Sequence, residues 1–183
     1  MRFRRTFIFV DLSGFTTFTE QHGDGTAAQL LSKFRAVARA VGSHQGVRID
    51  KYLGDGLMAV AVEAHDGITF AMELQRHATV ACAPLSLRIG IATGDTMLFE
   101  GQDYIGWAPN MAARLCDAAH GVGALLPEDQ ATNLPIGLSA LAHPELEIPG
   151  FNGPIRVVAL AGEPLIDGRY DINEVILGAP FVS

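Results

Sequence analysis

The spacing of apolar and polar residues along the chain predicts alternating strands and helices. Residues 6–12 form an apolar run that ends in an acid, as a buried strand does. From Thr26, apolar side chains recur at helical spacing, and residues 66–80 and 108–119 also have helical patterns. Each segment is long enough to bury one face against a sheet.

Strands are predicted between and after these helices. The tight turn LGDG joins strands at 47–51 and 57–62 into a hairpin. The sequence LSLRIGIATG at 85–94 alternates and predicts a further strand, after which a Gly-rich polar segment reaches Gly106. Further short strands are predicted at 122–126, 144–148 and 155–160.

The first connection contains its own start and stop signals. SGFTTF opens a helix for which Ser13 is a suitable N-cap. The sequence HGDG at 22–25 interrupts that helix before the next helical pattern begins.

The order of strand, helix, hairpin, helix, strand, helix and strand predicts an α+β sandwich with a ferredoxin-like centre. A length of 183 residues suits one domain with a full hydrophobic core. We place that domain at residues 1–160. Residues 161–183 have no clear period and form a tail of unknown role, either a strap across the domain or a loose end.

Composition excludes several classes of protein. Apolar residues make up 49% of the chain and charged residues 18%, which indicates a globular protein. The net charge of −7 argues against a nucleic-acid polymer as partner, although a single nucleotide with its magnesium remains compatible. No stretch approaches the ~18 apolar residues of a membrane span. Cys82 and Cys116 make no zinc pattern and are expected to be reduced, so we expect a cytoplasmic protein.

Two acids stand where a divalent cation could bind. Asp11 ends the first strand in FVDLSGFT, and Asp55 occupies the hairpin turn in KYLGDG. Each position also has an ordinary structural explanation. If the strands are neighbours, however, both carboxylates converge at one end of the sheet, where they repel unless a cation lies between them. The turn after Asp11 leads into a helix N-terminus whose free amides favour phosphate, so the expected substrate contacts are Leu12, Ser13, Gly14 and Phe15.

A third segment, DYIGWAPNMAAR, contains Asn110 and Arg114, four residues apart on one face of the expected helix. Pro109 fits the first helical position, which places Asn110 near the positive helix end. An arginine fork there suits an anionic phosphorane. The alternative is that Arg114 pairs with a surface acid and Asn110 caps a backbone group.

Taken together and in this order, the three segments resemble the active-site motifs of the class III nucleotidyl cyclases, of the bacterial and actinobacterial adenylate cyclase type. The resemblance covers roughly residues 6–160 and includes LRIGIATG, which is similar to the strand that usually precedes the third motif. It implies the fold of that family, an α/β sandwich whose antiparallel-rich sheet is flanked by helices.

The resemblance also implies a reaction and a role for each residue. ATP would be converted to 3′,5′-cyclic AMP and pyrophosphate with two divalent cations, Mg²⁺ or Mn²⁺, held by Asp11 and Asp55. Lys51 and Asp103 would read the purine, Asn110 would position the ribose and Arg114 would stabilise the transition state. The protein would be a head-to-tail homodimer with two shared sites, in which the metal acids come from one subunit and the other four residues from its partner.

The motifs also depart from the family in two places. Pro109 stands where a small β-branched residue is usual, and Pro149 occupies the place of a phosphate-contacting lysine. Weaker triphosphate binding is expected there unless Arg156 or another base substitutes. One alternative is a catalytically weak or silent cyclase-like module that binds nucleotide or only dimerises. Another is a guanylate cyclase, in which residues such as Glu and Cys would replace the purine readers. No GxxxxGK[ST] phosphate loop and no GG[DE]EF motif is present, and the six scattered histidines are expected to be structural: His22, His44, His65, His77, His120 and His143.

Overall fold

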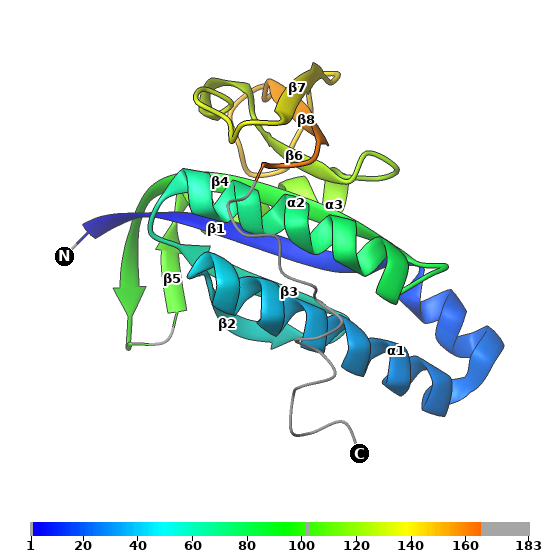
Figure 1. Cartoon of the computed structure of the whole chain (residues 1–183). Coiled ribbons are helices and arrows are strands. Elements are labelled where there is room, and N and C mark those ends of the chain that lie inside the picture. The colour runs from blue at the N-terminus through cyan, green and yellow to red at the C-terminus, as the bar shows by residue number, and fades with distance from the viewer. Residues whose placement is uncertain (1, 102, 166–183) are drawn as a thin grey trace.

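The computed structural model describes residues 2–101 and 103–165, whose helices and strands are labelled in Figure 1. The helices are α1 (Phe15–Gln45), α2 (Ala64–Ala81) and α3 (Trp107–Ala118), with a short 3₁₀ helix, η1 (Glu128–Gln130). The strands are β1 (Arg2–Ser13), β2 (Arg48–Leu53), β3 (Gly56–Ala61), β4 (Ser86–Phe99), β5 (Asp103–Gly106), β6 (Ala124–Pro127), β7 (Leu138–Ala142) and β8 (Val157–Gly162).

One sheet organises the described part of the chain. Its strands lie in the order β2-β3-β1-β4-β6-β8-β7, and β5 pairs with β4. Each neighbouring pair in the series β2, β3, β1 and β4 is antiparallel, whereas β4 and β6 are parallel. Because α1 connects β1 to β2 and α2 connects β3 to β4, this part of the sheet is a βαββαβ unit. The predicted α+β class and its ferredoxin-like centre are confirmed.

Helices cover both faces of the sheet, with α1 and α2 in front and α3 behind in the view of Figure 1. Alternation along β1 divides its side chains between two cores. Ile8, Val10 and Leu12 join the core beneath α1 and α2. Phe7 joins the second core, which includes Met111 of α3. Buried apolar surface therefore fixes α3 against the face of the sheet opposite α1 and α2.

The N-cap predicted for α1 is wrong, although the helix does begin within SGFTTF. Ser13 is the last residue of β1, and Gly14 is the N-cap, with φ of 83° and no side-chain cap hydrogen bond. Glycine takes this left-handed conformation at little cost, so the chain turns there directly from strand to helix. The interruption predicted at 22–25 is present as a kink inside α1 at Gly23, where φ and ψ are 81° and 161°.

The structure also differs from the predicted strands after residue 94. The segment predicted as a polar connection to Gly106 is a two-stranded arm, because β4 continues to Phe99 and β5 pairs back along it. The strand predicted at 144–148 is wrong, since that segment forms an isolated bridge between Leu146 and Ile155. Strand β7 was not predicted. The predicted tail lies mostly outside the described residues.

Two further features concern the helices. Helix α3 begins at Trp107, so Pro109 is its third residue and not its first. Proline is tolerated there because the first-turn N–H groups have no helical partner to lose. None of the helices among the described residues combines the length and the apolar character that crossing a bilayer demands.

Candidate active site

The two predicted metal acids lie at the same end of the sheet. Asp11 on β1 is paired with Gly56, the first residue of β3, and the two-residue turn that contains Asp55 immediately precedes Gly56. A side chain at position 56 would lie 2.5 Å from the Val10 carbonyl oxygen and 3.4 Å from Asp11 Oδ1. Glycine at this position therefore allows the turn to approach β1 closely, and it brings Asp55 beside Asp11.

The electrostatics of this pair favour a cation. Burial raises the pKa of the Asp55 carboxyl, and the negative charge of Asp11 raises it further. A backbone hydrogen bond and the Arg88 guanidinium act in the opposite direction without cancelling the rise. The protein thus holds two carboxylates close together, and their negative charge is only partly compensated by the protein. A divalent cation would supply the missing positive charge.

Two carboxylate ligands, Asp11 and Asp55, suit a cation that is also coordinated by phosphate oxygens of a substrate. Among the residues that the structure describes, no group of three or more His, Cys, Asp or Glu side chains could hold a metal ion. Mg²⁺ is commonly bound through one or two carboxylates together with substrate phosphates and water. Asp11 and Asp55 therefore fit Mg²⁺ or Mn²⁺ bound jointly with a polyphosphate, and not a closed protein cage.

Arg88 on β4 contacts one acid of this pair, Asp11. Asp11 and Arg88 face each other in the β1–β4 register, and Arg88 Nη2 donates a hydrogen bond to Asp11 Oδ2. The Arg88 and Asp11 side chains are 24% and 25% exposed. Sequence reasoning missed this residue because it treated LRIGIATG only as a strand. The available signal was a single basic side chain inside an otherwise apolar strand.

The two predicted purine readers contact each other directly. Lys51 Nζ on β2 donates a hydrogen bond to Asp103 Oδ1 at the start of β5, over a distance of 2.8 Å. This hydrogen bond raises the pKa of the Lys51 ammonium, so the lysine is a cation at neutral pH. Lys51 is also 3.8 Å from Asp50 Oδ2. The fold therefore joins two distant segments, β2 and the β4–β5 arm, through one donor–acceptor pair.

Close packing against β4 positions α3. A Cβ at Gly90 would overlap the Ala112 carbonyl oxygen and the Cys116 amide, and one at Gly94 would lie 3.1 Å from Ala108 Cβ. The small residues of α3 recur every four positions and meet Gly90 and Gly94, which lie four residues apart on one face of β4. The backbones of α3 and β4 are therefore in direct contact. This contact sets the rotation of the helix, so that its opposite face is exposed to solvent.

The exposed side of α3 borders an open groove of about 860 Å³. Asn110 and Arg114 line it from the helix, and the segment after β7 supplies the facing wall, including Pro149. The complete lining is Ile105, Gly106, Trp107, Asn110, Ala113, Arg114, Pro149, Gly150, Phe151, Asn152 and Ile155. Among the described residues that line the groove, Arg114 is the one that carries a charge. Its side chain is 53% exposed and lies 3.8 Å from Asp117, the surface pairing that the sequence alternative described.

Sequence reasoning missed two aromatic residues of this groove. Trp107 and Phe151 pack edge to face, with ring centroids 6.3 Å apart. Arg156, suggested as a substitute for the missing lysine, lines a separate pocket and lies 3.2 Å from Glu145. Among the described residues, no basic side chain of the segment after β7 lines the groove.

The predicted phosphate turn directly follows Asp11. The Leu12 side chain is 1% exposed and belongs to the core, so only its backbone could meet a ligand. The first backbone hydrogen bond of α1 runs from Phe18 to the Gly14 carbonyl at 2.9 Å. The amides before Phe18, including that of Phe15, are therefore the free donors that a helix N-terminus offers to an anion.

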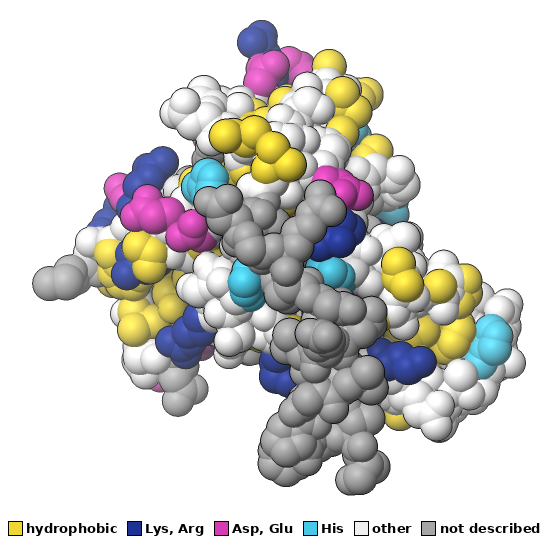
Figure 2. All heavy atoms as spheres, viewed as in Figure 1, with side chains coloured by type: hydrophobic (Ala, Val, Ile, Leu, Met, Phe, Trp, Pro, Cys, Tyr) yellow, Lys and Arg dark blue, Asp and Glu magenta, His cyan; other side chains and the backbone are white. Residues whose placement is uncertain are grey.

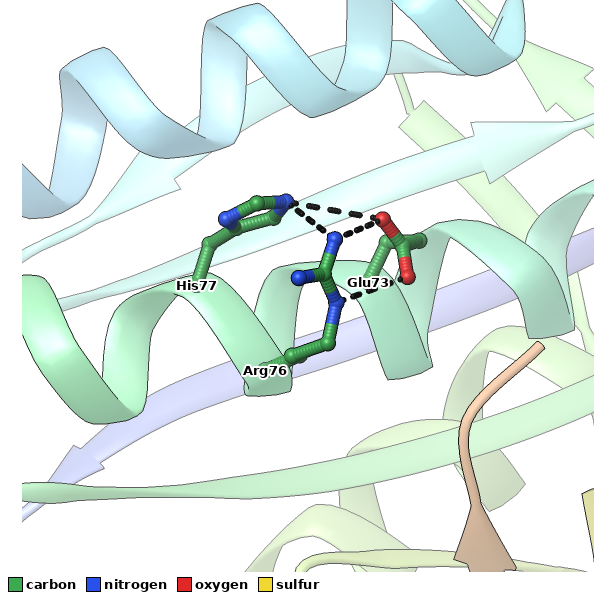
Figure 3. A network of polar contacts seen from close by, with 3 residues as sticks. All are labelled: Glu73, Arg76 and His77. Atoms are coloured by element: carbon green, nitrogen blue, oxygen red, sulfur yellow. Dashed lines mark hydrogen bonds and ion pairs between the residues drawn. The ribbon is translucent and has the colours of Figure 1, made fainter. Parts of the chain in front are cut away.

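A second polar cluster lies on α2 (Figure 3). The Glu73 side chain is 1% exposed and accepts two hydrogen bonds from Arg76, Nε to Oε1 at 3.1 Å and Nη2 to Oε2 at 2.8 Å. His77 Nε2 lies 3.5 Å from Glu73 Oε2. This bidentate pair satisfies a buried acid within one helix and is separate from the candidate site.

Comparison with known sequences gives partial matches. An uncharacterized protein of Mycobacterium tuberculosis is 33% identical over 156 residues, which cover 85% of this chain and 41% of that protein. A protein named adenylate cyclase from Streptomyces coelicolor is 30% identical over 111 residues, or 61% of this chain and 29% of that protein. The chain thus spans about two fifths or less of these relatives. No family model matches it.

Comparison with solved structures defines the fold. The adenylyl cyclase CyaB from P. aeruginosa superposes with a TM-score of 0.77 and 21% identity, covering 93% of this chain and 97% of that one. The guanylate cyclase domain of RhGC from Catenaria anguillulae has a TM-score of 0.75 and 16% identity, covering 89% and 99%. The chain therefore has the fold of a class III nucleotidyl cyclase catalytic domain, as the sequence motifs predicted.

Proposed function

We propose that residues 1–160 form the catalytic domain of an adenylate cyclase that converts ATP to 3′,5′-cyclic AMP and pyrophosphate. The observation that carries this proposal is the 2.8 Å contact between Lys51 Nζ and Asp103 Oδ1. Adenine offers an acceptor at N1 and a donor at its 6-amino group, which match a lysine donor and a carboxylate acceptor held side by side. The relative named adenylate cyclase supports the same assignment.

The remaining residues would position the substrate and stabilise charge, which is most of what phosphoryl transfer requires. Asp11 and Asp55 would hold two divalent cations, Mg²⁺ or Mn²⁺, which when bound acidify the ribose 3′-hydroxyl and offset charge on pyrophosphate. The backbone amides of residues 13–15 would donate hydrogen bonds to phosphate oxygens. On α3, Asn110 would orient the ribose, and Arg114 would donate hydrogen bonds to the α-phosphate oxygens as their charge grows.

A complete site would need a second copy of the chain. Within the described residues, the groove of Asn110 and Arg114 contains neither metal acid in its lining. The neighbouring β4–β5 arm exposes four large apolar side chains, those of Met97, Leu98, Phe99 and Ile105. Hydrophobic side chains gather at the left of Figure 2, the side on which Figure 1 places this arm. A two-stranded arm of this kind is marginally stable unless another surface covers it. We therefore propose a head-to-tail homodimer with two shared sites.

The deciding experiment is an assay of the purified protein with ATP or GTP, in Mg²⁺ or Mn²⁺, scored for cyclic product. Cyclic AMP formation that depends on the cation and exceeds cyclic GMP formation would support the proposal. Nucleotide binding without product would instead favour the silent binding or dimerisation module. Predominant cyclic GMP formation would overturn the adenine assignment.

A further inference from the structure

The ion pair between the half-buried Asp11 and Arg88 differs in geometry from the Glu73–Arg76 pair on α2. Arg76 grips Glu73 with both Nε and Nη2, and the two side chains close a ring of hydrogen bonds (Figure 3). Arg88 reaches Asp11 through Nη2, and its buried Nε has no hydrogen-bond partner among the described residues. A buried donor without a partner is unfavourable, so this guanidinium is held by one contact and retains unused donor capacity.

The backbone at Arg88 is held by two hydrogen bonds, whereas its guanidinium makes a single one. Cys116 Sγ donates a hydrogen bond to the Arg88 carbonyl oxygen at 3.3 Å, and the next amide, that of Ile89, donates to the Gly123 carbonyl at 2.7 Å. The guanidinium can therefore change partners by rotamer changes without a shift of β4. These are the properties of a releasable contact.

The position of this contact matters because Asp11 is also a proposed metal ligand. A divalent cation at Asp11 would compete with the guanidinium for the same carboxylate and would be repelled by its positive charge. In the absence of a cation, the same charge partly offsets the repulsion between Asp11 and Asp55. Arg88 therefore acts on both acids, although it contacts only one of them.

We propose that Arg88 is a positioning residue that serves as the resident counter-charge of the Asp11–Asp55 pair and is displaced when a divalent cation binds. This inference rests on the metal role proposed for the two acids. It makes Arg88 a determinant of intrinsic metal affinity: the residue orders Asp11 before loading and weakens the binding of a cation in the absence of nucleotide.

The test measures Mn²⁺ binding to the nucleotide-free protein from the electron paramagnetic resonance signal of free Mn²⁺. Arg88→Gln removes the competing charge and should bind Mn²⁺ at least ~3-fold more tightly than the wild type. Arg88→Lys retains the charge and should remain close to the wild type. Arg156→Gln is the matched control, since Arg156 also makes a single contact with a carboxylate, Glu145, away from the acids. It should leave the affinity unchanged.

A second variant ties the effect to the proposed site. Asp11→Asn in the Arg88→Gln background should abolish the gain in affinity, and circular dichroism would establish that each variant is folded. Arg88→Met, which keeps most of the side-chain volume, replaces Arg88→Gln if the latter does not fold. Equal or weaker Mn²⁺ binding after loss of the arginine would overturn the inference, as would a gain that survives Asp11→Asn.

The assay for cyclic product separates this result from the proposed function. A wild type that forms cation-dependent cyclic AMP, with no tighter Mn²⁺ binding by Arg88→Gln, would overturn only the counter-charge role. Absence of Mn²⁺ binding by both proteins, with no cyclic product from the wild type in either cation, would overturn the metal role and this inference together.

Discussion

At the scale of single residues, the fold imposes an electrostatic penalty on Asp55. Because its pKa is raised in the folded protein, the ionised carboxylate destabilises the fold above that pKa, and the penalty disappears as the pH falls below the ordinary value of 3.8. Asp55→Asn should therefore raise the melting temperature of the cation-free protein at pH 7, by a margin that shrinks on acidification. Asp24→Asn, at an exposed position of α1, is the control; an unchanged or lower melting temperature for Asp55→Asn at pH 7 would contradict this account.

The metal role proposed for Asp11 and Asp55 also predicts an effect on activity. Asp11→Ala and Asp55→Ala should each abolish cyclase activity while the protein stays folded. Removing a ligand of a catalytic cation costs several kcal/mol of transition-state stabilisation, or roughly 10³-fold in rate. Product formation and circular dichroism would be measured on the same samples. If either folded variant retained more than about a tenth of wild-type activity, the replaced residue would not be a ligand of the catalytic cation.

The contact between Lys51 and Asp103 predicts base preference. Guanine reverses both polarities at the edge that adenine presents, so each mismatch leaves an unsatisfied group and costs about 1–3 kcal/mol. ATP should be preferred to GTP by at least ~100-fold in kcat/KM. Lys51→Glu combined with Asp103→Cys should weaken or reverse that preference. Equal use of both nucleotides by the wild type would show that this pair does not read the base.

The spacing of the motifs in the sequence was enough to nominate Asp11, Asp55 and Lys51, because their residue types and order are distinctive. It could not reveal Arg88, whose importance depends on its register opposite Asp11 across two strands that lie far apart in sequence. Nor could it show that Arg156 lies away from the groove. A contact between distant segments becomes visible only when the sheet is assembled.

At the scale of elements, the close approach of α3 to β4 makes Gly90 critical. Gly90→Ala would place a methyl group against the backbone of α3, which must move away. Overpacking of this kind typically costs about 1–3 kcal/mol. The variant should unfold at lower urea concentration, and below its unfolding transition its cyclase activity should fall because Asn110 and Arg114 shift with the helix.

Gly25→Ala is the control for that substitution, because no atom lies within 4 Å of the position that its Cβ would occupy. Its position in α1 favours alanine, so stability should be unchanged or slightly higher. If Gly90→Ala were as stable and as active as Gly25→Ala, the backbone contact would not be what positions α3.

The elements themselves were predictable where their periodicity was strong. The alternation of LSLRIGIATG and the helical spacing after Thr26 reflect burial that the tertiary structure preserves. The β4–β5 arm was missed because its glycines and acids have the composition of a loop. The arm is formed by the pairing of β5 with the end of β4, which the composition of the segment does not indicate. The strand expected at 144–148 was wrong because its alternating apolar residues, Leu146 and Ile148, pack on the second core while the segment forms only an isolated bridge.

At the scale of the whole molecule, the proposed dimer predicts rescue by mixing. Asp11→Ala and Arg114→Ala should each inactivate the homodimer, because every site would lack one essential residue. In a mixed dimer, one site receives both defects and the other receives neither. Random exchange makes about half of the dimers mixed, each with one working site, so activity should recover to roughly a quarter of wild type.

The control for mixing is Asp11→Ala with Asp55→Ala. Both residues are proposed to serve the same half of the site, so each site of their mixed dimer lacks one metal acid, and no recovery is expected. Subunit exchange would be verified with differently tagged chains. If the Asp11→Ala and Arg114→Ala mixture stayed inactive after verified exchange, these residues would not act across a subunit boundary.

The aromatic wall of the groove gives the protein an optical property. Trp107 is the one tryptophan in the sequence, it is 43% exposed, and it stands at the start of the helix that carries Asn110 and Arg114. Indole emission shifts to shorter wavelength when water leaves its surroundings. The wild-type chain therefore has its single tryptophan at the groove, and binding of the proposed nucleotide or second subunit should be measurable in real time from tryptophan emission without any label.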